Sequence, residues 1–144
     1  MIEMITVVLI LGAITFIAIP RINFTGLYRI KANAVAKQIA TDLRRTRTLA
    51  ISYAANNTKG YALQMLGGSP YTSYNIVDIN SGSAVSTITI GSSVSCTGGS
   101  LFKFGPFGNL LSGSSAAPVS VSSSGKTYTI TVISATGIVQ CGGG

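Results

Sequence analysis

The side chains able to carry acid–base, nucleophilic or metal chemistry are few in this sequence. There are no histidines, and the three acidic residues, Glu3, Asp42 and Asp78, lie far apart along the chain. General acid–base catalysis usually needs histidine or a carboxylate with a shifted pKa, and zinc or calcium sites need several ligands close together. A serine or threonine nucleophile with a lysine base is conceivable, but no motif indicates one. We therefore expect no enzymatic activity, no cofactor and no metal.

The two cysteines, Cys96 and Cys141, form no CxxC pattern. Charged residues make up only 9% of the chain, and its C-terminal part is rich in Ser, Thr and Gly, which is typical of extracellular β-rich proteins. In an exported protein two cysteines most simply form one disulfide, which would stabilise the fold by about 4 kcal/mol on the chain-entropy model. We favour this disulfide, and the alternative is a pair of buried free thiols.

Glu3 lies at the start of an apolar segment, residues 1–20, that has no charge from Met4 to Pro20. A carboxylate is costly in hydrocarbon or in a core unless something neutralises it. The segment is close to the ~20 residues that span a bilayer, which predicts a transmembrane anchor. A signal-peptide core is the other hypothesis, although the basic start and the small-residue cleavage site are missing. Gly12 is a weak helix former and Pro20 a helix breaker.

Residues 21–57 form a second helical segment of different character. Apolar residues recur at spacings near three to five, which predicts an amphipathic helix continuing the first segment as a rod of about 80 Å. This stripe consists of Leu27, Ile30, Ala34, Ile39, Leu43 and Leu49. Seven of the ten basic residues fall in the same segment, namely Arg21, Arg29, Lys31, Lys37, Arg44, Arg45 and Arg47.

Residues 58–144 read as a β-rich domain. Several stretches alternate apolar and polar residues and are separated by turn signals, which predicts an antiparallel sheet with one face against a core. These stretches are YALQML, SYNIVDI, STITIG, SLFKF, PVSVS and KTYTITVI. The fold class predicted is therefore α+β, with the amphipathic half of the helix packed on the sheet.

The segment IEMITVVLILGAITFIAIP resembles the N-terminus of type IV pilins and pseudopilins. Glu3 falls on the family's N-terminal glutamate, Gly12 on a common glycine and Pro20 on its helix-loosening proline, all with one offset. By this resemblance the chain starts two residues after a mature pilin, so the methylated N-terminal residue and the leader precede it. The resemblance implies a type IV pilin-like fold, a long N-terminal helix with an apolar, protruding half and an amphipathic half packed on a C-terminal antiparallel β-sheet.

The resemblance also implies roles for these three residues. In pilin filaments the glutamate is thought to meet the N-terminal amine of a neighbouring subunit, and breaking such a buried pair can cost ~3–5 kcal/mol. The alternative is that Glu3 reaches the lipid headgroups from a plain anchor. The stretch from Gly12 to Pro20 is implied to melt into extended chain on assembly, whereas the alternative is a proline kink in a membrane helix.

Three further stretches resemble the H-type minor pseudopilins of type II secretion and the FimT-like minor pilins. They are DLRRTRTLAISYAANN at the end of the helix, the turn FGPFG at 104–108, and the closing stretch ITVISATGIV. Ile138 stands where FimT-like DNA binders tend to carry arginine.

Three functional hypotheses follow, in order of preference. The first is a structural subunit of an extracellular type IV pilus-like filament, a homopolymer at the bacterial cell surface that is held in the inner membrane before the assembly machinery polymerises it. The second is a minor pseudopilin of a periplasmic type II secretion pseudopilus. The third, a DNA-binding minor pilin for DNA uptake, rests on the net charge of +7 and has no known reader motif.

Two sequons permit N-glycosylation, one at Asn23 and one at Asn56.

Overall fold

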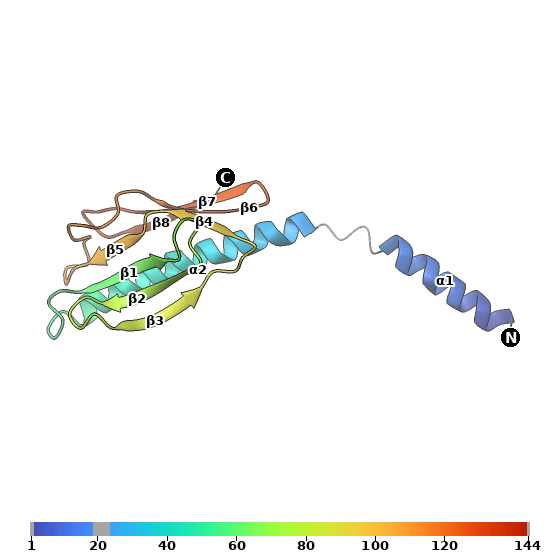
Figure 1. The fold of residues 1–144 in the computed structure, drawn as a ribbon, viewed down its shortest axis with the longest axis horizontal. Helices are drawn as coiled ribbons and strands as arrows, with labels where there is room; N and C mark the ends of the chain where they lie inside the picture. Colours follow the sequence, from blue (N-terminus) through green and yellow to red (C-terminus); the bar gives the residue numbers. More distant parts are fainter. Residues whose placement is uncertain (1, 19–23, 144) are drawn as a thin grey trace.

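The computed structural model describes residues 2–18 and 24–143, which form two helices and eight strands. The helix α1 (Ile2–Ala18) lies apart from residues 24–143, which we call the body (Figure 1). Within the body the longer helix α2 (Phe24–Ser52) runs along the strands. The strands are β1 (Tyr61–Leu66), β2 (Ser73–Asp78), β3 (Ala84–Thr89), β4 (Ser95–Gly98), β5 (Leu101–Phe104), β6 (Val119–Ser123), β7 (Lys126–Val132) and β8 (Val139–Gly143). The predicted α+β class is confirmed.

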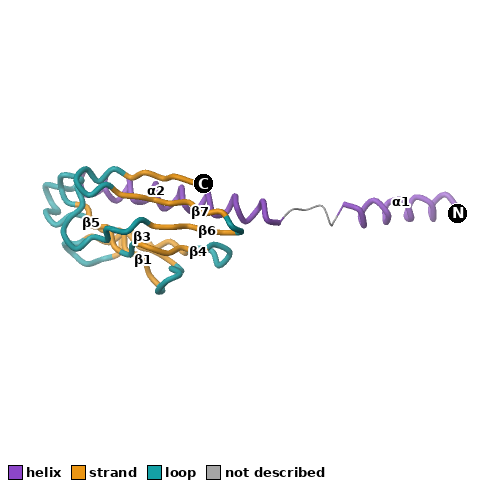
Figure 2. The backbone as a smooth tube through the Cα atoms, turned by 90° about the horizontal axis from the view of Figure 1, so that it is seen from above, coloured by secondary structure: helices purple, strands orange, loops and turns teal. Residues whose placement is uncertain are grey.

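The strands form two antiparallel sheets where the sequence predicted one. The first sheet has the order β3-β2-β1-β5, and the second has the order β4-β6-β7-β8. Figure 2 shows the strands, drawn in orange, beside α2 and away from α1. The chain leaves β3 and enters β4, yet β4 pairs with β6 through Cys96 and Val121 and joins the other sheet. The predicted number of sheets was wrong because period-2 alternation identifies a strand but does not specify which other strand it pairs with.

The described part of the apolar N-terminal segment is the helix α1. α1 has 17 residues, about 26 Å at 1.5 Å per residue, against a hydrocarbon thickness of about 30 Å. Within residues 2–18 and 24–143 no helix combines the length and the hydropathy needed to cross a membrane. The bilayer span predicted for residues 1–20 is therefore not found in the described residues. Pro20 lies outside them.

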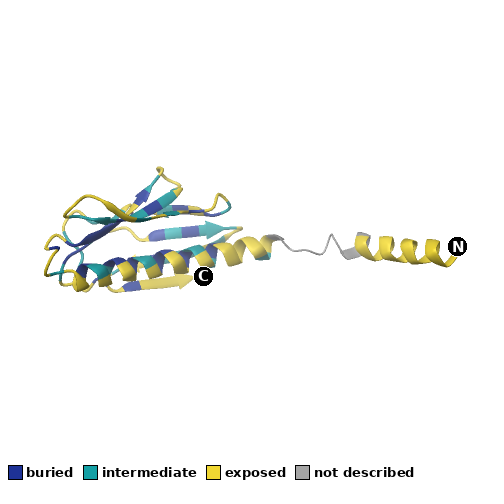
Figure 3. Ribbon diagram, turned by 90° about the horizontal axis from the view of Figure 1, so that it is seen from below, coloured by how far each residue is buried: buried dark blue, intermediate teal, exposed yellow. Residues whose placement is uncertain are grey.

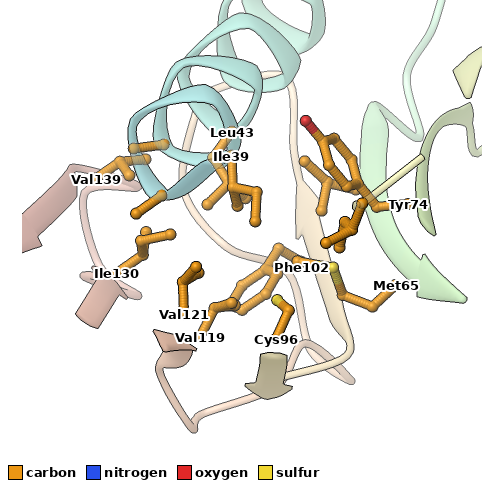
Figure 4. Packing of buried hydrophobic residues seen from close by; sticks show 14 of the residues in the cluster. Ile39, Leu43, Met65, Tyr74, Cys96, Phe102, Val119, Val121, Ile130 and Val139 are labelled. Carbon is orange, nitrogen blue, oxygen red and sulfur yellow. The ribbon is translucent and has the colours of Figure 1, made fainter. Parts of the chain in front are cut away.

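The core lies between α2 and the inner faces of both sheets. In Figure 4, Ile39 and Leu43 of α2 point between Tyr74 and Met65 of the first sheet and Ile130 and Val139 of the second. All of these side chains are buried, and Phe102 and Cys96 close the cluster from below. The body therefore completes its own hydrophobic core without any contribution from α1.

The buried face of α2 is offset from the predicted stripe. Ile39 and Leu43 are buried as the stripe requires, but Leu27, Ile30 and Ala34 are exposed. The face that packs on the sheets consists mainly of small residues, which let the helix axis approach the strands closely. Its members are Ala32, Ala36, Ile39, Ala40, Leu43, Thr46 and Ala50. Large apolar side chains alone therefore marked the wrong face for the first turns of α2.

Two hydrogen-bonded links fasten α2 to the first sheet. The Tyr74 hydroxyl donates to Asp42 Oδ2 at 2.6 Å, and burial together with this carboxylate raises the pKa of the Tyr74 phenol well above its usual range. Beyond the helix, Asn57 Nδ2 donates to Asp78 Oδ1 at 2.6 Å. Desolvation opposes ionisation of Asp78, but hydrogen bonds from the backbone N–H groups of Asn80 and Ser81 and from Asn57 hold its pKa below the usual value. Both acidic residues of the body, Asp42 and Asp78, therefore already accept hydrogen bonds from other residues of the body.

Candidate functional site

The helix α1 presents apolar side chains around its whole circumference. Every residue from Ile2 to Thr15 is exposed, and this part of the helix is yellow in Figure 3. The large apolar ones are Ile2, Met4, Ile5, Val7, Val8, Leu9, Ile10, Leu11 and Ile14. A helix that is apolar on all sides is normally buried in a larger assembly or in lipid, because soluble monomers rarely expose so large an apolar surface. None of the described residues covers α1, so its burial would require something outside them.

The few polar groups on α1 are satisfied within the helix. The Thr6 hydroxyl donates to the Ile2 carbonyl at 2.8 Å, and the Thr15 hydroxyl donates to the Leu11 carbonyl at 3.0 Å. A hydroxyl paired with its own helix can be transferred from water at little cost, whereas an unpaired one cannot. These two threonines therefore do not prevent burial of α1.

Glu3 is the exception on this apolar surface. It lies in the first turn of α1, where the helix dipole favours a negative charge, and it has no hydrogen-bond or ion-pair partner among the described residues. Asp42 and Asp78, in contrast, accept hydrogen bonds from Tyr74 and Asn57. Burying Glu3 would therefore require a cation or a donor from outside the described chain.

Four further residues were predicted from the sequence to have a role: Gly12, Pro20, Asn23 and Asn56. Gly12 lies inside α1, and a Cβ placed there would meet nothing within 4 Å, so packing within the chain does not require a glycine. Pro20 and the sequon residue Asn23 lie outside the described residues. The second sequon residue, Asn56, is exposed in the turn after α2, next to the buried Asn57.

Three stretches that are far apart in the sequence meet at Arg47. This arginine, near the end of α2, donates from Nε to the carbonyl of Gly108 in the FGPFG turn at 3.0 Å. Gly137, between β7 and β8, has φ +65° and lies so close to the same Gly108 carbonyl and to Arg47 that a Cβ would overlap the carbonyl. Ile51 of α2 also lies next to Gly108, because a Cβ on that glycine would meet both Ile51 and Arg47. The helix end, the turn and the closing stretch therefore form one junction, which we call the Arg47 junction.

The FGPFG turn itself is held by backbone hydrogen bonds. Gly108 N–H donates to the Gly105 carbonyl at 2.8 Å, and Gly105 N–H donates to the Asn109 carbonyl at 3.0 Å. Leu110 N–H donates to the Ser134 carbonyl at 3.0 Å, which ties the turn to the β7–β8 connection. The turn holds Phe107 at its tip with 92% of the side chain exposed.

The disulfide predicted between Cys96 and Cys141 is not formed, and both cysteines are free thiols. Cys96 is buried in β4 and Cys141 is exposed in β8, at opposite edges of the second sheet. Two strands, β6 and β7, lie between them, so their backbones are about 14 Å apart at the usual strand spacing. A disulfide needs Cα atoms within about 7 Å. The prediction was wrong because the cysteine count says nothing about sheet order.

The two thiols should differ sharply in reactivity. Burial raises the pKa of the Cys96 thiol to about 11, so it is both protonated and shielded at neutral pH, whereas Cys141 is exposed. We expect a maleimide reagent to label one thiol in the native chain and two after denaturation without reductant, as counted by mass spectrometry. Cys141→Ser is the matched control and should abolish native labelling. Two unreactive cysteines in denaturant without reductant would instead mean a disulfide.

The basic residues of α2 lie mostly at the surface. Arg29, Lys31, Lys37, Arg44 and Arg45 are exposed, and Arg47 is half-buried. Lys31 Nζ lies over the Tyr28 ring at 5.7 Å from its centroid, and Arg44 Nη2 donates to the Val139 carbonyl at 3.1 Å. No array of aromatic rings interleaves these described cations, so α2 has a positive surface rather than a stacking platform for bases.

An open groove on the body is lined mainly by hydroxyl groups. It has a volume of about 580 Å³ and lies between the 92–95 stretch and the β6–β7 turn, and its lining consists mostly of serines together with residues such as Pro70 and Thr127. None of the described side chains that line it is charged. Across residues 2–18 and 24–143 no three His, Cys, Asp or Glu side chains are grouped as metal ligands.

The exposure of Phe107 was missed by reasoning from the sequence. An aromatic residue placed between glycine and proline in a short turn was the available signal, because such a turn leaves no neighbouring strand to cover the ring.

Comparisons with protein-family models, with curated proteins and with solved structures find no match to this chain. Its function is therefore argued from α1 and the Arg47 junction alone.

Proposed function

We propose that this protein is a subunit of a helical type IV pilus-like filament at the bacterial cell surface, assembled through α1. The observation that carries the proposal is a helix that is apolar on every side, attached to a body whose core is complete without it. Before assembly α1 would associate with the inner membrane, and in the filament it would be covered by copies of itself.

The energetics support burial of α1 against other helices. Nine large apolar side chains are exposed on it, and each contributes about 1.5–3 kcal/mol when fully buried. The gross gain is thus on the order of 15–25 kcal/mol, which exceeds the roughly 4–15 kcal/mol that association costs in lost freedom. A helix with an apolar surface on all sides needs neighbours on all sides, and a head-to-tail contact that does not close into a ring produces such an array.

Glu3 gives this assembly its register. An apolar helix bundle alone permits sliding along the helix axes, because one ring of Ile, Leu and Val resembles the next. A single carboxylate that must meet the N-terminal amine of a neighbour selects one offset, since any other offset leaves a charge buried without a partner. The described residues offer Glu3 no internal partner, which is consistent with this role.

A second candidate is a minor pseudopilin of a type II secretion pseudopilus. The Arg47 junction favours it, because the three stretches that resemble the H-type minor pseudopilins lie together in space rather than at unrelated sites. A DNA-binding minor pilin is supported only by the exposed cations of α2. Both alternatives keep α1 as the assembly element and differ in abundance and partners.

Electron microscopy of sheared cell-surface material, with mass spectrometry of the purified fibres, tests the proposal. We expect thin fibres made chiefly of this chain. Fibres dominated by a different subunit, with this chain present only in traces, would favour the minor pseudopilin. If the chain were found only as single copies in the membrane, with no fibre of either kind, α1 would be a plain anchor and the filament proposal would be wrong.

A further inference from the structure

Four exposed apolar residues are carried by segments that meet where α2 ends, and α1 takes no part in this meeting. We call these four residues the distal patch: Ile51 (43% exposed), Phe107 (92%), Ile133 (39%) and Ile138 (48%). They come from three segments, the end of α2, the FGPFG turn and the β7–β8 connection. Neither the core nor the proposed assembly helix accounts for their exposure.

The contacts of the Arg47 junction bring together the backbone segments that carry these four residues. Ile51 Cδ1 lies 2.7 Å from the position that a Cβ on Gly108 would occupy, and Phe107 precedes that glycine. Gly137 packs on the Gly108 carbonyl and precedes Ile138. Ile133 N–H donates to the Ile138 carbonyl at 2.9 Å, which places these two residues opposite each other across the turn. The patch is thus preorganised by backbone contacts, so little ordering entropy remains to be lost on binding.

Two arginines are fixed at the base of the distal patch. Arg47 donates to the Gly108 carbonyl beside Phe107, and Arg44 donates to the Val139 carbonyl beside Ile138. Arg44, Arg47 and Ile51 are spaced three and four residues apart, so they lie along one face of α2. The two carboxylates of the body bind Tyr74 and Asn57 instead of these guanidinium groups. An apolar tip is therefore backed by positive charge that no described carboxylate of the body neutralises.

We propose that the distal patch binds the surface of an anionic lipid bilayer. Phe107 and the three isoleucines would enter the boundary between headgroups and acyl chains, while Arg44 and Arg47 would meet the headgroup phosphates above it. Such a layered arrangement of apolar and cationic side chains is what an anionic membrane surface binds, with about 1 kcal/mol from each basic residue near the surface. The chemistry recognised is that of a phosphate-bearing lipid, and no stereospecific pocket is required.

A second copy of this chain fits the patch less well than a membrane. Its net charge is +7, and its two body carboxylates, Asp42 and Asp78, already accept hydrogen bonds from Tyr74 and Asn57, so a second copy repels Arg44 and Arg47 overall. A partner protein with an apolar pocket would have to enclose Phe107, which stands at the tip of a convex turn. The planar bilayer meets a convex tip without such a pocket. This inference does not depend on the filament proposal, because it uses the opposite end of the body from α1.

The sequence makes a local test straightforward because it contains no tryptophan. Phe107→Trp in the full chain places one fluorescent reporter, the tip reporter, on the patch. Val85→Trp places a matched one, the β3 reporter, at a 48% exposed apolar site. Each variant is mixed with vesicles of phosphatidylglycerol and phosphatidylcholine, or of phosphatidylcholine alone, that carry brominated acyl chains. Since α1 is expected to bring the chain to both kinds of vesicle while the distal patch lies at the opposite end of the body, the patch would meet a second vesicle. Tryptophan emission and its quenching are therefore measured rather than total binding.

We expect the emission of the tip reporter to shift to the blue and to be quenched with phosphatidylglycerol vesicles, and much less with phosphatidylcholine alone or at high salt. The emission of the β3 reporter should neither shift nor be quenched with either kind of vesicle. Arg44→Gln, which keeps a donor for the Val139 carbonyl but removes the charge, should weaken the partitioning of the tip reporter about fivefold. Emission from the tip reporter that stays water-like with both vesicles, or changes equally in the β3 reporter, would overturn the proposal. A blue shift that grows with protein concentration and needs no lipid would overturn it in favour of a second copy.

Discussion

Replacing Glu3 with alanine should abolish filaments of the full chain at any concentration the cell reaches. In the proposed assembly Glu3 neutralises the N-terminal amine of a neighbour inside an apolar bundle. Removing one partner leaves the other charge buried alone, at a cost of about 3–5 kcal/mol. Because each 1.4 kcal/mol is a factor of ten, the concentration at which subunits polymerise should rise about 100- to 4,000-fold. Sedimentation of purified chain across a concentration series measures this shift directly.

Two neighbouring variants separate charge from shape at the same end of α1. Glu3→Gln keeps the length and a polar end but loses the charge, so it should fail almost as completely if the partner is an amine. Met4→Ala removes an exposed apolar side chain from the adjacent position and should raise the polymerisation concentration only about tenfold. Fibres of Glu3→Ala that form at the unmodified concentration would show that Glu3 is a headgroup-facing residue of a plain anchor.

Substituting alanine for Gly137 should destabilise the body by about 3–5 kcal/mol. Its φ of +65° lies in the left-handed region, where a side chain costs roughly 1–3 kcal/mol. In addition, a Cβ there would overlap the Gly108 carbonyl, whose neighbour is the Arg47 guanidinium, so the backbone of the FGPFG turn must shift and overpacking adds a similar cost. For a body of this size the midpoint of thermal unfolding should fall by roughly 10–20 °C.

Gly82→Ala is the matched control for this strain. Gly82 has nearly the same conformation, φ +71°, but a Cβ there meets nothing within 4 Å. Only the cost of the backbone conformation then remains, roughly 1–3 kcal/mol, so the midpoint should fall by several degrees less than for Gly137→Ala. Circular dichroism during heating compares the two variants. Equal losses for Gly137→Ala and Gly82→Ala would mean that the close packing at the Arg47 junction contributes nothing to stability.

The disagreement over the cysteines shows where local reasoning fails. The stretch that contains Cys141 and the stretch SCTG around Cys96 carry no strong alternation, and neither β4 nor β8 was predicted as a strand from its own pattern. Both are short, and β8 ends in glycines that have no β propensity. Without those strands the order of the second sheet cannot be written down, so the placement of β6 and β7 between the two thiols could not be inferred.

The sequence by itself determined the elements whose signal is local. The run from Ile2 to Ala18 has no helix breaker and only one charge, which predicts an apolar helix with a single carboxylate at its start. Alternation and turn residues located β1, β2, β3, β5, β6 and β7 to within two residues, because a strand with one buried face must repeat every second residue. The α+β class follows from the long helical run together with the period-2 alternation of the strands.

Only the tertiary structure decided which of these elements face one another. The buried face of α2 depends on the two sheets that flank it, so small residues such as Ala32 and Ala36 are buried while Leu27 and Ile30 are exposed. The meeting of Arg47, Gly108 and Gly137 joins positions up to 90 residues apart through a carbonyl and a glycine, neither of which has a side chain that could signal the contact. Backbone contacts of this kind leave no periodicity in the sequence, and the exposed tip that they support at Phe107 becomes visible only when the chain is folded.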